Sequence, residues 1–199
     1  MNPWMDCQAL LNEHPCSSGQ LTQTGVARST LSRWVKSGRI LRLAHGLYGL
    51  PEATFDEHHS LVLAQGQMPN GVLCLLSALQ FHGITSQLPR EVWMAMEGGS
   101  HRPRVTGIKV RVCRFTGDAY SSGIEIHKVE GGSLRIYSVT KTVIDCFRMR
   151  NKIGVDVAIE ALRDALRSRK TTIGELESTA AGLRARTILR PYLEMAAAS

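Results

Sequence analysis

The sequence has no run of apolar residues that approaches the roughly 20 needed to cross a bilayer as a helix. Its five cysteines are scattered and form no C-x-x-C pair, so we predict neither a disulfide framework nor a structural zinc site. The first residues place acids among apolar side chains and lack the basic start of a signal peptide. We therefore expect a cytoplasmic protein that binds no metal.

Motifs of catalysis are also missing. The sequence contains no Walker loop, no G-x-G-x-x-G, no G-x-S-x-G and no H-E-x-x-H. A restriction-type nuclease would need an acid on one strand and an acid-x-lysine on the next to hold magnesium. Asp118 with the segment EIHK at 125–128 comes nearest, but Glu125 and Lys128 would point to opposite faces of a strand. We expect no enzymatic activity and no cofactor.

What the sequence does have is a surplus of positive charge. Lys and Arg number 24 against 17 Asp and Glu, which gives a formal net charge of +7 over 199 residues. Such a balance favours a polyanionic partner, although it also serves plain solubility. The 43% of apolar residues are enough for one large domain or two small ones.

Residues 18–51, SGQLTQTGVARSTLSRWVKSGRILRLAHGLYGLP, predict a helix-turn-helix. A short helix over 19–24, capped by Ser18, ends at Gly25 in a left-handed turn, and a second helix runs over about 27–37. At about 100° per residue, Leu31, Trp34 and Val35 share one side of that helix. The opposite side offers hydroxyls and cations that suit DNA, and Arg28 and Thr30 flank it. The predicted recognition face consists of Ser29, Ser32, Arg33 and Lys36.

A basic hairpin follows this helix. Residues 39–43 and 47–50 read as two strands, and Gly46 supplies the positive φ that a tight turn needs. Arg39, Arg42 and His45 would reach a phosphate backbone or a minor groove. The whole predicts a winged helix-turn-helix that binds DNA, while a winged helix used only for docking proteins stays the alternative.

The segment GVARSTLSRWVKSGRILRLAHGLY resembles the N-terminal winged-helix domain of the AbiEi antitoxin family, the predicted transcriptional regulators of bacterial defence systems. The pieces most typical of the family are Gly38-Arg39 and the wing ending Gly46-x-Tyr48.

After a linker at 51–54, we predict a larger second domain over 55–199, so that the first domain spans 1–51. An apolar helix is expected over 72–82, then β structure, then a series of helices in which Val155 and Leu162 face inward. The fold class is therefore α+β, a winged helix followed by a mixed domain. Its four candidate strands lie at 91–96, 108–115, 124–130 and 133–137.

The middle of the second domain carries a second group of cations, with no acid between residues 102 and 114. Along 108–113, Ile108, Val110 and Val112 are expected to face the core. Groups of this kind are often just solvated faces, but beside a DNA-reading domain one would extend its positive potential. The possible secondary basic patch comprises Arg102, Arg104, Lys109, Arg111 and Arg114.

Landmarks in the second domain are similar to the AbiEi C-terminal region, although the family usually has arginine where Lys141 stands. They are Leu76-Ser77-Ala78-Leu79, His82-Gly83-Ile84, Ser138-Val139-Thr140, Thr142-Val143 and Asp145.

The resemblance implies a phage-defence antitoxin of the type IV toxin-antitoxin class. It would bind inverted repeats in double-stranded promoter DNA, repress its own operon, and counter a nucleotidyltransferase toxin without a stable complex. A stand-alone regulator without a toxin is the alternative, and the neighbouring reading frame separates the two. No heptad pattern predicts a dimerisation helix, so a monomer or a weak dimer on DNA is expected.

Overall fold

A computed structural model describes residues 3–13, 16–44, 46–51, 58–130 and 132–197. The chain divides into two compact units. The first comprises Met1–Asn70, Arg102–Lys109 and His127–Leu134, and the second comprises Gly71–His101, Val110–Ile126 and Arg135–Ser199. The predicted domain boundary at 52–54 lies outside the described residues and stays a prediction.

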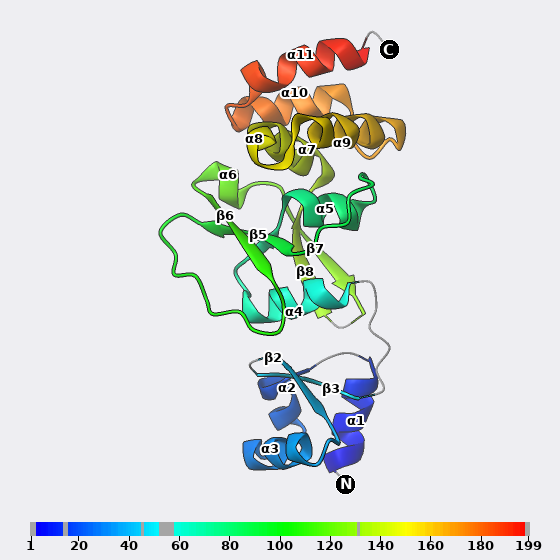
Figure 1. The fold of residues 1–199 in the computed structure, drawn as a ribbon, viewed down its shortest axis with the longest axis vertical. Helices are drawn as coiled ribbons and strands as arrows, with labels where there is room; N and C mark the ends of the chain where they lie inside the picture. The colour runs from blue at the N-terminus through cyan, green and yellow to red at the C-terminus, as the bar shows by residue number, and fades with distance from the viewer. Residues whose placement is uncertain (1–2, 14–15, 45, 52–57, 131, 198–199) are drawn as a thin grey trace. The chain divides into compact units, whose positions relative to one another are not determined.

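The N-terminal part of the first unit is a winged helix-turn-helix, so the predicted fold class is confirmed here (Figure 1). Its small sheet has the order β1-β3-β2 and is antiparallel throughout. Cys16 pairs with Tyr48 and Leu41 pairs with Gly49, so the segment before α2 forms a third strand against the hairpin. The elements are α1 (Pro3–Glu13), β1 (Cys16–Ser17), α2 (Ser18–Gln23), α3 (Arg28–Lys36), β2 (Leu41–Ala44) and β3 (Leu47–Gly49).

Local sequence signals set the ends of these helices. Ser17, rather than the predicted Ser18, caps α2, because its hydroxyl accepts from Gln20 while the Gln20 side chain accepts from the Ser17 backbone. Gly25 has φ +86°, which confirms the predicted left-handed turn before α3. Gly38, with φ +71°, ends α3 in the same way and lets the Arg39 amide bond back to Trp34.

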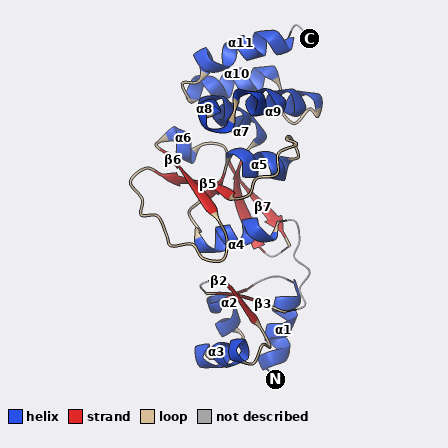
Figure 2. Cartoon of the chain, viewed as in Figure 1, coloured by secondary structure: helices blue, strands red, loops and turns tan. Residues whose placement is uncertain are grey.

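The larger sheet is mixed and has the order β6-β5-β4-β8-β7 (Figure 2). β5 runs parallel to β6 and antiparallel to β4, while β4 runs parallel to β8. The four predicted strands are present, within a few residues of their expected ends. The strands are β4 (Val72–Leu73), β5 (Val92–Glu97), β6 (Val110–Phe115), β7 (Ile124–Val129) and β8 (Gly132–Tyr137).

The predicted helix over 72–82 is wrong at its start. Val72 and Leu73 form β4, where Leu73 pairs with Met94 on one side and Ile136 on the other. The helix α5 begins only at Leu75 and ends at His82. A short apolar run fits a buried strand as well as a buried helix, and only the neighbouring strands decide between them.

Two predicted side-chain directions also need correction. Val155 is the first residue of α9 and is 42% exposed, whereas Leu162 is buried as expected. In β6 the expected alternation holds for Val110 but breaks at Val112, which is only half-buried while the adjacent Cys113 is buried. Both errors concern the end of an element or an irregular strand, where regular periodicity does not apply.

The helices α8, α9, α10 and α11 pack against α7, which also contacts α5 (Figure 1). Ser138 caps α7 by accepting from the Lys141 amide at 3.3 Å. Across the described residues, no helix is both long and apolar enough to span a membrane. The helices are α4 (His59–Gln67), α6 (Asp118–Ser121), α7 (Val139–Arg148), α8 (Arg150–Ile153), α9 (Val155–Arg167), α10 (Ile173–Gly182) and α11 (Arg186–Ala197).

The cap of α10 predicts a dependence of stability on pH. The backbone amide and the hydroxyl of Thr172 donate to Glu175, which lowers the pKa of that carboxyl below its ordinary value of 4.5. Because the pKa is lower in the folded state, the stabilisation is present above pH 4.5 and is lost as the pH falls through the folded-state pKa. We expect the melting temperature of the wild type to fall more steeply with acidification than that of Glu175→Gln. Glu177→Gln on the same helix is the control, and equal slopes for Glu175→Gln and the wild type would contradict the expectation.

Candidate nucleic-acid interface

The two sides of α3 differ as the sequence predicts. Leu31 is buried, and Trp34 and Val35 pack against the core of the winged helix. The side chains on the other side are open to solvent, and Thr30 at its edge is half-buried. The exposed residues are Arg28, Ser29, Ser32, Arg33 and Lys36.

Arg33 and Lys36 lie in the last turn of α3. Among the described residues, neither side chain forms an ion pair or a hydrogen bond with another part of the protein. No acid of the described part of the chain therefore neutralises their charges. Short serine side chains beside them leave the helix backbone able to approach a groove closely, and the cations can reach base edges or phosphates.

The hairpin of β2 and β3 brings further cations to the same domain. Arg42 is exposed on β2 opposite Tyr48, while the predicted contact His45 lies outside the described residues. Gly46 has φ +75°, as the predicted turn requires. The amide of Ser18 donates to the Gly46 carbonyl at 2.7 Å, which ties the start of α2 to the wing.

Trp4 is a residue of this surface that the sequence pattern did not reveal. The Arg39 guanidinium lies 4.3 Å from the centre of the Trp4 ring, and that ring meets Trp34 edge-on at 4.9 Å. Stacking on an aromatic face limits the motion of the guanidinium while its N–H groups keep their directions. The signal in the sequence was the aromatic residue on the first helix, whose partner only the tertiary structure supplies.

The possible secondary basic patch divides between the two units. Arg102, Arg104 and Lys109 belong to the first unit, while Arg111 and Arg114 belong to the second. All five side chains are exposed.

Arg111 pairs with Glu91, Nε to Oε1, at 2.5 Å, and stacks over Trp93 at 4.7 Å. Arg114 donates through Nη1 to the carbonyl of Glu97 at 3.0 Å and to that of Ser100 at 2.5 Å. Arg114 holds the turn after β5 and Arg111 contacts the start of β5, so both arginines have structural roles in the second unit.

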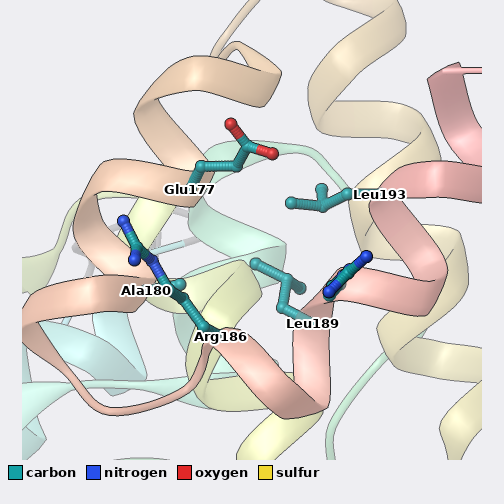
Figure 3. A pocket seen from close by; sticks show the side chains of 6 residues that line it. Glu177, Ala180, Arg186, Leu189 and Leu193 are labelled. Carbon is teal, nitrogen blue, oxygen red and sulfur yellow. The ribbon is translucent and has the colours of Figure 1, made fainter.

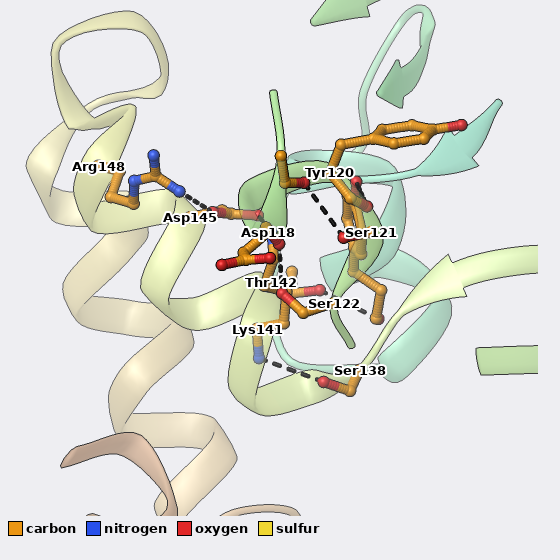
Figure 4. A network of polar contacts seen from close by, with 11 residues as sticks. Asp118, Tyr120, Ser121, Ser122, Ser138, Lys141, Thr142, Asp145 and Arg148 are labelled. Carbon is orange, nitrogen blue, oxygen red and sulfur yellow. Dashed lines mark hydrogen bonds and ion pairs between the residues drawn. The ribbon is translucent and has the colours of Figure 1, made fainter. Parts of the chain in front are cut away.

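A buried ionic network lies at the centre of the second unit (Figure 4). The Lys141 ammonium contacts the Asp145 carboxylate and lies 4.0 Å from the centre of the Tyr137 ring. The carboxylate also accepts from Arg148 Nη1 at 3.2 Å. Burial lowers the pKa of Lys141 and raises the pKa of Asp145, because desolvation disfavours both charged forms more than their attraction favours them. Lys141 is 0% exposed, so no ligand reaches it and the network is structural.

A pocket of about 210 Å³ lies between α10 and α11 (Figure 3). Arg186 and Arg190 stand at its rim with Glu177, and Leu189 and Leu193 form its apolar wall. It is smaller than the roughly 300 Å³ at which small-molecule sites begin. Within the described part of the chain, no group of three or more His, Cys, Asp or Glu residues is placed to hold a metal ion.

A helix-turn-helix with its cationic face exposed and a hairpin beside it defines a winged-helix protein. Residues 17–51 match the family described as "Transcriptional regulator, AbiEi antitoxin", which confirms the resemblance predicted for the N-terminal winged helix; the resemblance of the second domain stays a prediction. That family comprises regulators of transcription that act as antitoxins, which is not a class of enzymes. No curated protein matches the sequence.

The crystal structure of the RV2827C protein from Mycobacterium tuberculosis is similar to the chain, with a TM-score of 0.61 and 17% identity. The match covers 94% of this chain and 75% of that chain. At this identity the likeness shows a shared fold, and it extends well beyond the winged helix into the α+β part.

Proposed function

We propose that the protein is a sequence-specific DNA-binding repressor. The observation that carries the proposal is the recognition face of α3, where Ser29, Ser32, Arg33 and Lys36 are exposed opposite the buried Leu31. Arg28 and Thr30 flank this face, and Arg39 and Arg42 contact the phosphate backbone from the wing. The double-stranded promoter of its own operon is the proposed target.

The family match supports a second role as the antitoxin of a type IV toxin-antitoxin system of phage defence. In this proposal the winged helix represses the operon through inverted repeats, and the α+β part opposes a nucleotidyltransferase toxin without a stable complex. The two half-sites are filled by monomers in succession or by a weak dimer.

The test of DNA binding is a gel shift with the DNA upstream of the gene at two salt concentrations. A scrambled DNA of the same composition separates specific from general binding. We expect a complex that weakens as salt rises and that prefers the upstream DNA. Absence of binding at low salt would contradict the proposed function.

The antitoxin role is tested separately. We expect the neighbouring reading frame to encode a nucleotidyltransferase whose expression stops growth, and co-expression of this chain to restore it. A variant that lacks Arg33 and Lys36 should still restore growth when both genes are expressed from foreign promoters. Failure of the wild type to restore growth would favour a stand-alone regulator.

A further inference from the structure

The loop at residues 102–109, RPRVTGIK, comes from the middle of the chain but belongs to the same compact unit as the winged helix. It contains three cations and no acid. The side chains of Arg102, Arg104 and Lys109 are all exposed. Positive charge is thus concentrated on a segment that the chain folds back onto its N-terminal unit.

Hydrogen bonds of one side chain hold this loop. Gln67, at the end of α4, donates through Nε2 to the carbonyl of Thr106 at 3.0 Å. Its Oε1 atom accepts from the amide of Thr106 at 2.8 Å and from the Thr106 hydroxyl at 3.3 Å. The amide group of Gln67 therefore satisfies both backbone groups of Thr106, as a paired strand would, and fixes the loop to α4.

The next two residues bring the loop against the wing. Gly107 has φ +80°, and a Cβ at this position would lie 3.0 Å from the carbonyl oxygen of Leu43 in β2. Ile108 packs against a small apolar cluster that contains Leu47 and Leu63, and Leu43 packs against the same cluster. The absence of a side chain at residue 107 is what allows the loop backbone to approach the wing strand so closely.

We infer that the loop 102–109 is an auxiliary DNA-contacting element beside the wing, whose Arg102, Arg104 and Lys109 neutralise phosphates next to those bound by Arg42. This inference rests on the proposed function and deepens it. We assign these cations to phosphates rather than to base edges, so the loop contributes affinity and salt dependence rather than sequence preference. Arg111 and Arg114 belong to the second unit and are not part of this element.

The charge of the loop is tested with Arg102→Ala/Arg104→Ala/Lys109→Ala in the full chain. Each lost phosphate contact lowers the salt slope, the magnitude of d log K/d log[salt], by about 0.9. We expect the slope to fall by about 2 to 3, a shorter hydroxyl-radical footprint, and an unchanged ratio of affinities for specific and scrambled DNA. The matched control is Arg163→Ala/Arg167→Ala/Arg169→Ala, which removes the same charge from exposed positions of the second unit and should leave the slope as it is.

The position of the loop is tested without a change of charge. Gln67→Ala removes the hydrogen bonds to Thr106, and Gly107→Val places a branched side chain against the Leu43 carbonyl. We expect each variant to show part of the slope loss of the triple variant while circular dichroism and thermal unfolding confirm a folded chain. If Gln67→Ala or Gly107→Val unfolds, the triple alanine variant still tests the auxiliary element, because its three changes lie on the surface.

The outcomes separate the inference from the proposed function. If the wild type binds the upstream DNA and the triple variant keeps both its slope and its footprint, the auxiliary element is ruled out while the repressor stands. Equal slope losses in the triple variant and in the second-unit control would also rule it out, because they would show an effect of net charge alone. If the wild type binds no DNA, the proposed function fails first.

Discussion

Replacing Lys141 with methionine is expected to lower the free energy of unfolding by about 3 kcal/mol, near the lower end of what breaking a buried ion pair costs. The Asp145 carboxylate is 1% exposed, so the change leaves a charge in the core. The loss stays near the lower end because Arg148 still donates to Asp145 at 3.2 Å. Denaturant unfolding at neutral pH measures the effect.

A double variant separates the contribution of the ion pair to stability from the contribution of packing. Lys141→Met/Asp145→Leu removes both charges, and we expect it to be clearly more stable than Lys141→Met, because buried pairs are often replaced by apolar residues at little cost. The control is the ion pair between Arg167 and Asp164 on α9, which are 3.0 Å apart near the surface. Arg167→Ala removes one partner of this pair and should cost under about 1 kcal/mol. A double variant no more stable than the single one would contradict this account of Lys141.

The stability of Lys141→Met should depend on pH in a defined direction. Burial raises the pKa of Asp145, and without Lys141 the carboxylate has lost an attractive charge. A carboxyl whose pKa is higher in the folded state binds more protons there, so the folded state gains stability as the pH falls through that interval. The deficit of Lys141→Met relative to the wild type is therefore expected to shrink between neutral and mildly acidic pH.

Replacing Arg33 with alanine is expected to weaken binding to the upstream DNA by about 1 to 3 kcal/mol, or roughly 5- to 150-fold, and to relax the sequence preference at one position. Arg33 is exposed in the last turn of α3 and, among the described residues, has no partner that would retain it. Lys36→Ala should weaken binding more evenly across sequences, since an ammonium acts mainly as a point charge toward phosphate. Competition gel shifts with single-base variants of the operator measure both effects.

The matched control for Arg33 is Arg163→Ala on α9, which removes an exposed cation from the second unit. It should leave affinity and preference as they are. Both α3 variants should unfold at the wild-type temperature, because both side chains are exposed. If binding is indifferent to Arg33 and Lys36, α3 is not the recognition helix.

Several elements were predictable because their causes are local. The glycines at 25 and 46 have the positive φ that the turns required, and Leu31 is buried opposite an exposed cationic face. α9 runs over Val155–Arg167, the range in which the periodicity is strongest. The sequence did not reveal β4, because its pairing with β5 and β8 decides that it is a strand. It also did not reveal Ser17 as the cap of α2, because the geometry of β1 decides which serine caps the helix.

For the candidate site, the sequence predicted which residues of α3 form the exposed face, but not which distant residues they and their neighbours contact. The recognition face follows from one helix and its period, but the stack of Arg39 on Trp4 needs α1 to pack beside the start of the wing. Lys141 and Asp145, four positions apart, look like an ordinary surface pair in sequence, and only the strands and helices packed against α7 enclose them. Long-range contacts of this kind leave no local pattern.

The sequence by itself determined that a winged helix with a cationic face stands at the start of an α+β chain, because turns, caps and helical periodicity act between near neighbours. The tertiary structure alone decided where the five cations at 102–114 lie. It placed Arg102, Arg104 and Lys109 in the unit of the wing and gave Arg111 and Arg114 partners in the other unit. The reason is that a side chain's role depends on which distant segment packs beside it.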